Sequence, residues 1–171
     1  MSKYKKLYET DNLYYTNLNY DLIPDYLTMV NDPNVQKFIS KQGRTFTYEE
    51  EVEWIKGRLE AGNPIFSIIE KSTDEFVGNI EYLDHDIGYE IGISLTPNKQ
   101  DRHYGTEAIN FMIDYGHNVM GIDDVRLSVF SHNDRAIHCY NKIGFVEERR
   151  EKDAFVINGQ SVDDIGMILK R

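Results

Sequence analysis

The sequence predicts an α/β fold of the α+β type, with a single mixed central sheet of about seven strands flanked by helices. Three observations support this prediction. Segments with the alternating pattern of strands lie near both ends of the chain. The centre of the chain has the order strand, helix, strand, helix, and hairpin signals both precede and follow it. Because hairpin strands are antiparallel and a strand–helix–strand unit gives parallel ones, the sheet must be mixed.

The first third of the chain predicts one strand and three helices. Thr47 and Glu50 have the spacing of a capping box, and Gly62 marks the end of the helix that this box opens. Pro24 is tolerated in the first turn of an earlier helix, where a proline N–H would have no partner in any case. The predicted segments are a strand over Asn12–Leu18, a helix over Asp21–Asn31, a short helix over Val35–Ile39 and the capped helix that follows Thr47.

The remaining two thirds predict six strands and two helices. Asn158-Gly159, between two β-rich runs, is the strongest hairpin signal in the chain. No repeat, low-complexity segment or linker interrupts the pattern, so we expect one domain over residues 1–171. The predicted strands are Ile65–Glu70, Phe76–Leu83, Gly88–Leu95, Asp124–Phe130, Phe145–Ile157 and Ser161–Leu169, and the predicted helices are Thr106–His117 and Asn133–Lys142.

The composition argues against several classes of protein. The 29 acidic and 19 basic side chains give a net charge of −10, which is untypical of a general nucleic-acid-binding protein. Cys139 is the single cysteine, so no intrachain disulfide can form and the chain suits a reducing cytoplasm. We expect neither a membrane span nor a signal peptide, because no apolar stretch has the necessary length. The five histidines lack metal-ligand spacing, so we expect no metal site.

The stretch after the strand Gly88–Leu95 predicts an anion-binding turn. A short connection carrying Gln100, Arg102 and Gly105 leads into the helix that begins near Thr106. The first amide groups of a helix lack partners and the helix dipole makes this end partly positive, so it attracts anions such as a pyrophosphate. Gly105 lets the backbone approach such a group because it has no Cβ. The alternative interpretation is an ordinary connection between a strand and a helix.

Two motifs resemble the GNAT family of N-acetyltransferases. Gln100-x-x-His103-x-Gly105 is similar to the acetyl-CoA loop of that family, Gln/Arg-x-x-Gly-x-Gly/Ala, with His103 in place of the first glycine. The segment from Asn133 to Phe145 is similar to the family segment Asn-x-x-Ala-x-x-x-Tyr-x-Lys-x-Gly-Phe. The predicted order of elements also resembles the whole GNAT fold. Within the family, the chain looks most like the branch of ribosomal-protein N-terminal and spermidine N-acetyltransferases.

The resemblance implies acetyl-CoA as cosubstrate, with its pyrophosphate on the loop Gln100–Gly105. Asp101 would repel the phosphates, and we expect Arg102 beside it to offset that charge. His103 departs from the glycine pattern, although histidine can adopt a left-handed backbone conformation at some cost. The residues implied to bind acetyl-CoA are Ile93, Leu95, Gln100, Arg102, His103, Tyr104, Gly105, Thr106, Asn133 and Ala136.

The resemblance also implies that Tyr140 is a general acid that protonates the CoA thiolate. A tyrosine hydroxyl, with a pKa of about 10, holds its proton at neutral pH and can donate it. The alternative is a core aromatic whose hydroxyl bonds elsewhere. The attacking amine must lose a proton, and Glu90 matches the position of the base in the family. Glu90 shares one strand face with Gly92, which fits either a cleft or a solvated face. Glu81 and an ordered water are the other candidates for the base.

The sequence leaves the acceptor amine open between a protein N-terminus and a small molecule such as a polyamine. The spermidine enzymes tend to carry acidic side chains between their first two helical segments, a region where this chain has Lys37, Lys41 and Arg44. This difference argues against a polyamine and leaves a peptide or an anionic amine open. The rival function is a non-catalytic acyl-CoA-binding regulatory module on the same fold. The changes in the acetyl-CoA loop favour that rival, and Tyr140 argues against it. The sequence also leaves open whether copies of the chain form a homo-oligomer.

Overall fold

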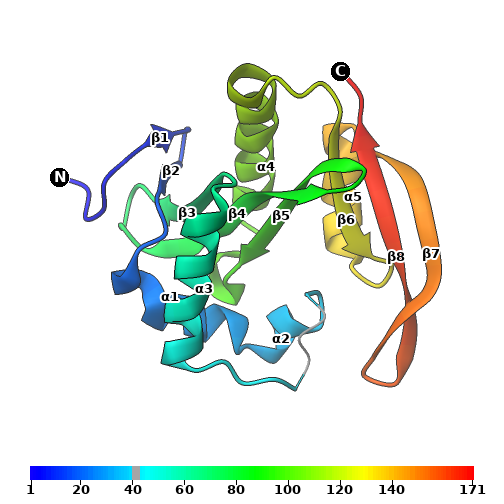
Figure 1. Cartoon of the computed structure of the whole chain (residues 1–171), viewed down its shortest axis with the longest axis horizontal. Helices are drawn as coiled ribbons and strands as arrows, with labels where there is room; N and C mark the ends of the chain where they lie inside the picture. Colours follow the sequence, from blue (N-terminus) through cyan, green and yellow to red (C-terminus); the bar gives the residue numbers. More distant parts are fainter. Residues whose placement is uncertain (40–42) are drawn as a thin grey trace.

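One mixed sheet, with eight strands in the part of the chain that the structure describes, organises the fold (Figure 1). The computed structural model describes residues 1–39 and 43–171. The strand order is β1-β2-β3-β4-β5-β6-β8-β7, and every neighbouring pair is antiparallel except β5 and β6. The mixed sheet confirms the prediction. There are eight strands rather than about seven because β1 (Tyr8–Glu9) has only two residues, too few to show an alternating pattern.

The other strands lie close to their predicted segments. The β7–β8 hairpin turns at Asn158 and Gly159, whose φ angles of 51° and 76° are left-handed, as this dipeptide favours. The strand bounds are β2 (Leu13–Thr16), β3 (Ile65–Glu70), β4 (Phe76–His85), β5 (Gly88–Leu95), β6 (Val125–Phe130), β7 (Val146–Ile157) and β8 (Gln160–Leu169).

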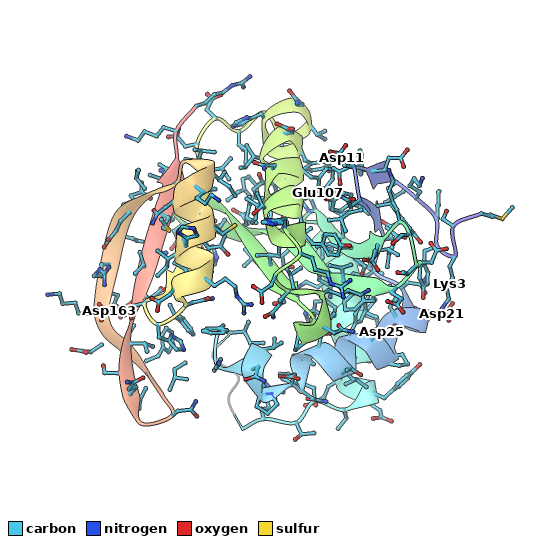
Figure 2. All side chains as sticks on the ribbon, turned by 180° about the vertical axis from the view of Figure 1, so that it is seen from behind. Lys3, Asp11, Asp21, Asp25, Glu107 and Asp163 are labelled. Atoms are coloured by element: carbon cyan, nitrogen blue, oxygen red, sulfur yellow. The ribbon has the colours of Figure 1, made fainter. Side chains whose placement is uncertain are left out.

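Helices cover both faces of the sheet. Figure 1 shows α1 (Ile23–Val30) and α3 (Tyr48–Ala61) in front of it, and Figure 2, from behind, shows α4 (Tyr104–Tyr115) and α5 (Asp134–Ile143) over the other face. No described helix is both long and apolar enough to cross a membrane. The shorter helical segments are η1 (Tyr20–Leu22), α2 (Pro33–Gln36), η2 (Pro97–Lys99) and η3 (Gly116–Met120), of which η3 is a π-helix.

The start of α3 confirms the predicted capping box. The Thr47 hydroxyl accepts from the Glu50 N–H at 3.3 Å, and the Glu50 carboxylate accepts from the Thr47 N–H at 2.8 Å. Gly62 ends the helix with a φ of 75°, which a residue with a Cβ adopts only with strain. These local contacts fix α3 at both ends, so the position of its side chains over the sheet is well defined.

Strand β3 is buried on both faces and joins two apolar cores. Phe66 and Ile68 belong to the core beneath α4, and Ile65 and Ile69 belong to the core beneath α1 and α3. The β1–β2 turn is also tied to α4, because the Glu107 carboxylate accepts from the Asn12 backbone N–H at 2.8 Å; Figure 2 shows Glu107 beside this turn. The helices on both faces are therefore packed against the sheet.

Strands β5 and β6 part from each other within the sheet. Their parallel pairing is limited to Glu90 with Arg126 and Ile91 with Leu127. Beyond this point β5 stays paired with β4 as far as Leu95, and β6 stays paired with β8. The sheet therefore opens between the two strands, and the helices on either face border the opening.

Candidate active site

Two cavities adjoin at the opening between β5 and β6. A cavity of about 990 Å³ lies on the face covered by α1 and α3, and a cavity of about 460 Å³ lies on the face covered by α4 and α5. Ile93, Ser94, Ser128 and Tyr140 line both of them. We call these the large and the small cavity. A ligand in each could therefore meet its neighbour at the parted strands, which is the geometry that a transfer reaction between two substrates needs.

The loop between β5 and α4 has a strained backbone at two residues. Asp101 and His103 are left-handed, with φ angles of 60° and 64°. His103 occupies the N-cap position of α4, and among the described residues no side chain caps this helix start. The first-turn residues Gly105 and Thr106 line the small cavity. The uncapped helix start is therefore suited to hold an anion.

Asp101 is paired with a residue that the sequence did not indicate. Its carboxylate accepts from Arg135 at 2.9 and 3.0 Å, and Arg135 also donates to the Gln100 side-chain oxygen at 2.6 Å. Gln100 in turn donates to the Leu95 carbonyl at 3.1 Å. The expectation that Arg102 would offset the charge of Asp101 is wrong, because Arg102 lies near Glu70 instead. Arg135 on α5 thus compensates the acid in the loop.

Arg102 and Tyr104 face away from both cavities, toward Glu70 at the end of β3. Glu70 accepts from the buried Lys99 at 2.6 Å and from the Tyr104 hydroxyl, and it lies 3.5 Å from Arg102. Hydrogen bonds from Lys99, then from the Thr73 and Tyr104 hydroxyls, lower the pKa of Glu70 to about 2. The group fastens the loop before α4 to the sheet. The other predicted acetyl-CoA residues line the small cavity: Ile93, Leu95, Gln100, His103, Gly105, Thr106, Asn133 and Ala136.

Replacing Glu70 by Gln is expected to lower the free energy of unfolding by about 2 kcal/mol at neutral pH, because the buried Lys99 loses a charged partner. The folded-state pKa of Glu70 lies below its usual value of 4.5, so this contribution is present above pH 4.5 and is lost as the pH falls toward 2. Urea denaturation at neutral and acid pH would measure it, and the gap between wild type and variant should shrink in acid. The control is Glu75→Gln, which removes the exposed second partner of Lys99 and should cost less. An equal gap at both pH values would contradict the expectation.

Tyr140 combines a packed ring with a free hydroxyl. Its ring lies in the core with Phe145 at a centroid distance of 6.1 Å. No hydrogen-bond partner for its hydroxyl occurs among the described residues, and the side chain borders both cavities. Burial raises the pKa of the Tyr140 hydroxyl, so the group holds its proton at neutral pH. Asn133 caps α5 by accepting from the Ala136 N–H at 3.3 Å, which sets the orientation of this helix.

Cys139, the neighbour of Tyr140, points to another partner. Its sulfur lies 3.1 Å from the Thr106 hydroxyl, so the pair joins α5 to the first turn of α4. The sequence predicts Cys139 to be a packing residue rather than a nucleophile, and this contact is compatible with that role.

Glu90 is buried, and three side chains from other strands of the sheet lie next to its carboxylate. Its carboxylate accepts from Ser128 at 3.1 Å and from Arg149 at 3.0 Å, and His85 lies 3.5 Å away. Glu90 does not line either cavity, but Ser128 lines both. Arg149 fits here because residue 166 is a glycine: a Cβ there would lie 2.6 Å from the Arg149 Nε. Glu90 thus reaches the cavities only through the Ser128 hydroxyl.

Glu81 faces the large cavity directly. It pairs with Arg58 at 3.1 Å and lies beside Gly92, since a Cβ built at that glycine would be 3.5 Å from the Glu81 Oε1. Burial raises the pKa of the Glu81 carboxyl, and the Arg58 guanidinium opposes this rise. A carboxylate with a raised pKa at a cavity wall has the properties of a general base.

Comparison with known proteins identifies the family. The sequence model of the acetyltransferase (GNAT) domain matches residues 12–146. The chain belongs to the GNAT acetyltransferase family. It is 29% identical over 101 residues to the spermidine N(1)-acetyltransferase of Vibrio cholerae, covering 56% of this chain and 57% of that protein. It is 35% identical over 80 residues to the spermidine N(1)-acetyltransferase of Escherichia coli K12, covering 47% of this chain and 43% of that protein. The chain thus matches about half the length of these curated relatives.

Solved structures show the same GNAT fold. The Vibrio cholerae spermidine N-acetyltransferase in complex with CoA and spermine superposes with a TM-score of 0.84 at 21% identity, covering 94% of this chain and 96% of that one. An acetyltransferase of the GNAT family from Bacillus anthracis superposes with a TM-score of 0.81 at 20% identity, covering 95% and 96%. The predicted GNAT fold is therefore confirmed.

The GNAT motifs indicated the lining of the small cavity better than the lining of the large cavity. Most of the residues that line the small cavity lie in the two motifs or on the strand before them. The wall of the large cavity formed by α1 and α3 carries neither of the two family motifs, so the motifs did not indicate its lining residues. Within the described residues, no group of His, Cys, Asp and Glu side chains could hold a metal ion.

Proposed function

We propose that this GNAT-family chain is an acetyl-CoA-dependent N-acetyltransferase that moves an acetyl group to a primary amine by direct attack. The observation that carries the proposal is the hydroxyl of Tyr140, which has no partner among the described residues and borders both cavities. Acetyl-CoA would occupy the small cavity and the amine the large one. The thioester carbon and the amine nitrogen would then meet at the parted strands.

The small cavity has the chemical groups that acetyl-CoA requires. The uncapped first turn of α4 would receive the pyrophosphate, and Gly105 leaves room for the backbone to approach it. Arg135 neutralises Asp101, so the loop does not present a bare carboxylate to the phosphates. The remainder of the CoA arm would lie along Ile93 and Ala136, where β5 has left β6.

The reaction requires two proton transfers. The amine nitrogen forms a bond to the acetyl carbonyl carbon, the carbon–sulfur bond breaks, and Tyr140 gives its proton to the leaving sulfur. The proton of the attacking amine passes to a carboxylate. Glu81 is our first candidate because it lines the large cavity and burial raises its pKa. Glu90, the base that the family resemblance implies, would act through the Ser128 hydroxyl.

The acceptor that we propose is a small, positively charged amine, for which spermidine is the first compound to test. The two curated relatives named above are spermidine N(1)-acetyltransferases. Among the described residues, five glutamates and two arginines line the large cavity. Of the basic residues that argued against a polyamine, Arg44 is paired with Glu50 at 3.0 Å, and Lys41 lies outside the described residues. Lys37 lies 4.9 Å from the centre of the Phe38 ring.

Release of the CoA thiol from acetyl-CoA would test the proposed function. Spermidine and short peptides with free N-termini would be offered in parallel, with a no-acceptor reaction as background. Release with an amine above the background would support the enzyme and identify its acceptor class. If the protein binds acetyl-CoA but releases no thiol with any amine, the rival reading of a non-catalytic acyl-CoA-binding module would replace the proposal.

A further inference from the structure

Glu51, on the wall of the large cavity, is a buried carboxylate without a partner. The residue is 6% exposed, and its side chain has no hydrogen bond or ion pair within the described part of the chain. Of the other glutamates that line the large cavity, Glu50 is paired with Arg44, Glu53 with Lys56 and Glu81 with Arg58, and Glu49 is exposed to water. Because Glu51 also borders the cavity, its carboxylate is open to a ligand there.

The position of Glu51 in the helix does not explain its burial. A carboxylate near the start of α3 interacts favourably with the helix dipole, but Glu49 and Glu50 provide that charge while exposed to water. A buried carboxylate without a partner costs free energy; a glutamine would avoid the cost of the charge, and a leucine would also avoid that of a polar group. Burial, with Glu50 nearby, raises the pKa of Glu51 in the ligand-free fold. The carboxylate therefore lacks the positive charge that would compensate its burial.

The surroundings of Glu51 suit an alkylammonium group. Tyr26, Met29 and Trp54 line the same cavity as Glu51, and the rings of Tyr26 and Trp54 meet edge to face with their centroids 5.9 Å apart. The Tyr26 hydroxyl is 2.6 Å from the Ser67 hydroxyl and accepts from the Asn19 N–H, so it has partners other than the nearby Glu51 carboxylate. Aromatic faces attract organic cations, and a carboxylate beside them adds a specific charge.

The place of Glu51 in the large cavity, relative to the proposed reaction at Tyr140, indicates the role of its carboxylate. The large cavity extends from the α1 and α3 wall, which carries Glu51, to Tyr140 at the parted strands. An amine reacting beside Tyr140 would therefore extend its other end toward Glu51. That end has to be cationic to compensate the carboxylate, and its carbon chain would cross an apolar surface.

We propose that Glu51 binds a second, non-reacting cationic nitrogen of the acceptor, so that the enzyme selects amines carrying two positive charges. The proposal rests on the function proposed above. It concerns a specificity-determining residue on the wall of the large cavity, outside both family motifs. Glu51 takes no part in the proton transfers.

The test compares 1,4-diaminobutane and spermidine with n-butylamine as acceptors for wild type and Glu51→Gln. The variant should raise the KM for the two polyamines by roughly 30-fold, as expected when one partner of a buried charge pair is lost. It should leave kcat within a few-fold and should not change the weak use of n-butylamine. Glu53→Gln is the matched control, because Glu53 lines the same cavity but is exposed and paired with Lys56. Glu53→Gln should change the KM and kcat neither for the polyamines nor for n-butylamine.

Two further measurements make the test decisive. The melting temperature of Glu51→Gln should equal or exceed that of wild type, because the substitution removes an uncompensated buried charge. A fall in melting temperature, or an equal loss with n-butylamine and the polyamines, would overturn the proposal and assign Glu51 a structural role. If wild type acetylates no amine, the proposed function fails, and calorimetry of 1,4-diaminobutane binding to wild type and Glu51→Gln then tests the site alone. Equal binding of 1,4-diaminobutane to both proteins, or no binding to wild type, would overturn the proposed role of Glu51.

Discussion

Replacing Tyr140 by Phe is expected to lower kcat by roughly 10² to 10⁴-fold, the range measured when a general acid is removed. The substitution deletes one oxygen and keeps the ring that packs on Phe145. It therefore removes the proton donor without opening the core. Without that proton the thiolate must leave as an anion into a buried site, which raises the barrier. The measurement is the rate of CoA thiol release at saturating amine.

Acetyl-CoA affinity separates this role from a structural one. Because the Tyr140 hydroxyl bonds to no described residue, its loss should leave the Kd for acetyl-CoA within a few-fold. The control is Tyr115→Phe, which removes a hydroxyl from α4 at a residue that lines neither cavity. That variant should keep wild-type turnover. A parallel loss of turnover and acetyl-CoA affinity in Tyr140→Phe would contradict the role of Tyr140 as general acid.

Replacing Glu81 by Gln is expected to lower kcat/KM by about 100-fold, because the amine loses its proton acceptor. A general base works only when ionised, so wild-type activity should fall as the pH drops through the pKa of Glu81. Burial raises that pKa above its usual value of 4.5, and the acid limb of the pH–rate profile should lie correspondingly higher. The acid limb should be absent from the pH–rate profile of Glu81→Gln. The matched substitution is Glu90→Gln, which should have a smaller effect and should keep the limb.

If Glu90→Gln lowered kcat/KM more than Glu81→Gln, the general base would be Glu90. Its path to the cavity runs through Ser128, so a Ser128→Ala variant should then be as slow as Glu90→Gln. If neither carboxylate variant moves the acid limb, an ordered water takes the proton. Each of these outcomes is read from the same pH–rate profiles.

Features set by neighbouring residues were predicted well from the sequence. The capping box of α3, the glycine after it and the Asn158-Gly159 hairpin depend on contacts within a few positions, and all three are present. The predicted helix Thr106–His117 is less accurate: α4 begins at Tyr104, and the helix continues as a π-helix from Gly116 to Met120. Propensity does not distinguish these kinds of helical turn.

Features that depend on side chains meeting across the fold were not predictable. Arg135 on α5 reaches Asp101 in the loop before α4, and Arg149 on β7 reaches Glu90 on β5 across the two strands between them. Neither pair has a spacing that a single sequence can reveal. The burial of Glu51 is of the same kind, because the acidic run around it reads as a solvated helix face. The family motifs thus indicate where acetyl-CoA would bind, and long-range contacts decide which charges remain free to recognise the acceptor.

The parting of β5 and β6 also links ligand binding to folding. A sheet that opens in its middle has few cross-strand bonds between its two halves; here the described part of β5 pairs with β6 at two residue pairs. A molecule lying in that gap contacts both halves and binds only the folded chain. At a free concentration of 100 times Kd, such a ligand adds about 2.7 kcal/mol to the free energy of unfolding. The lifetime of this protein against proteolysis would then follow the supply of its cosubstrate.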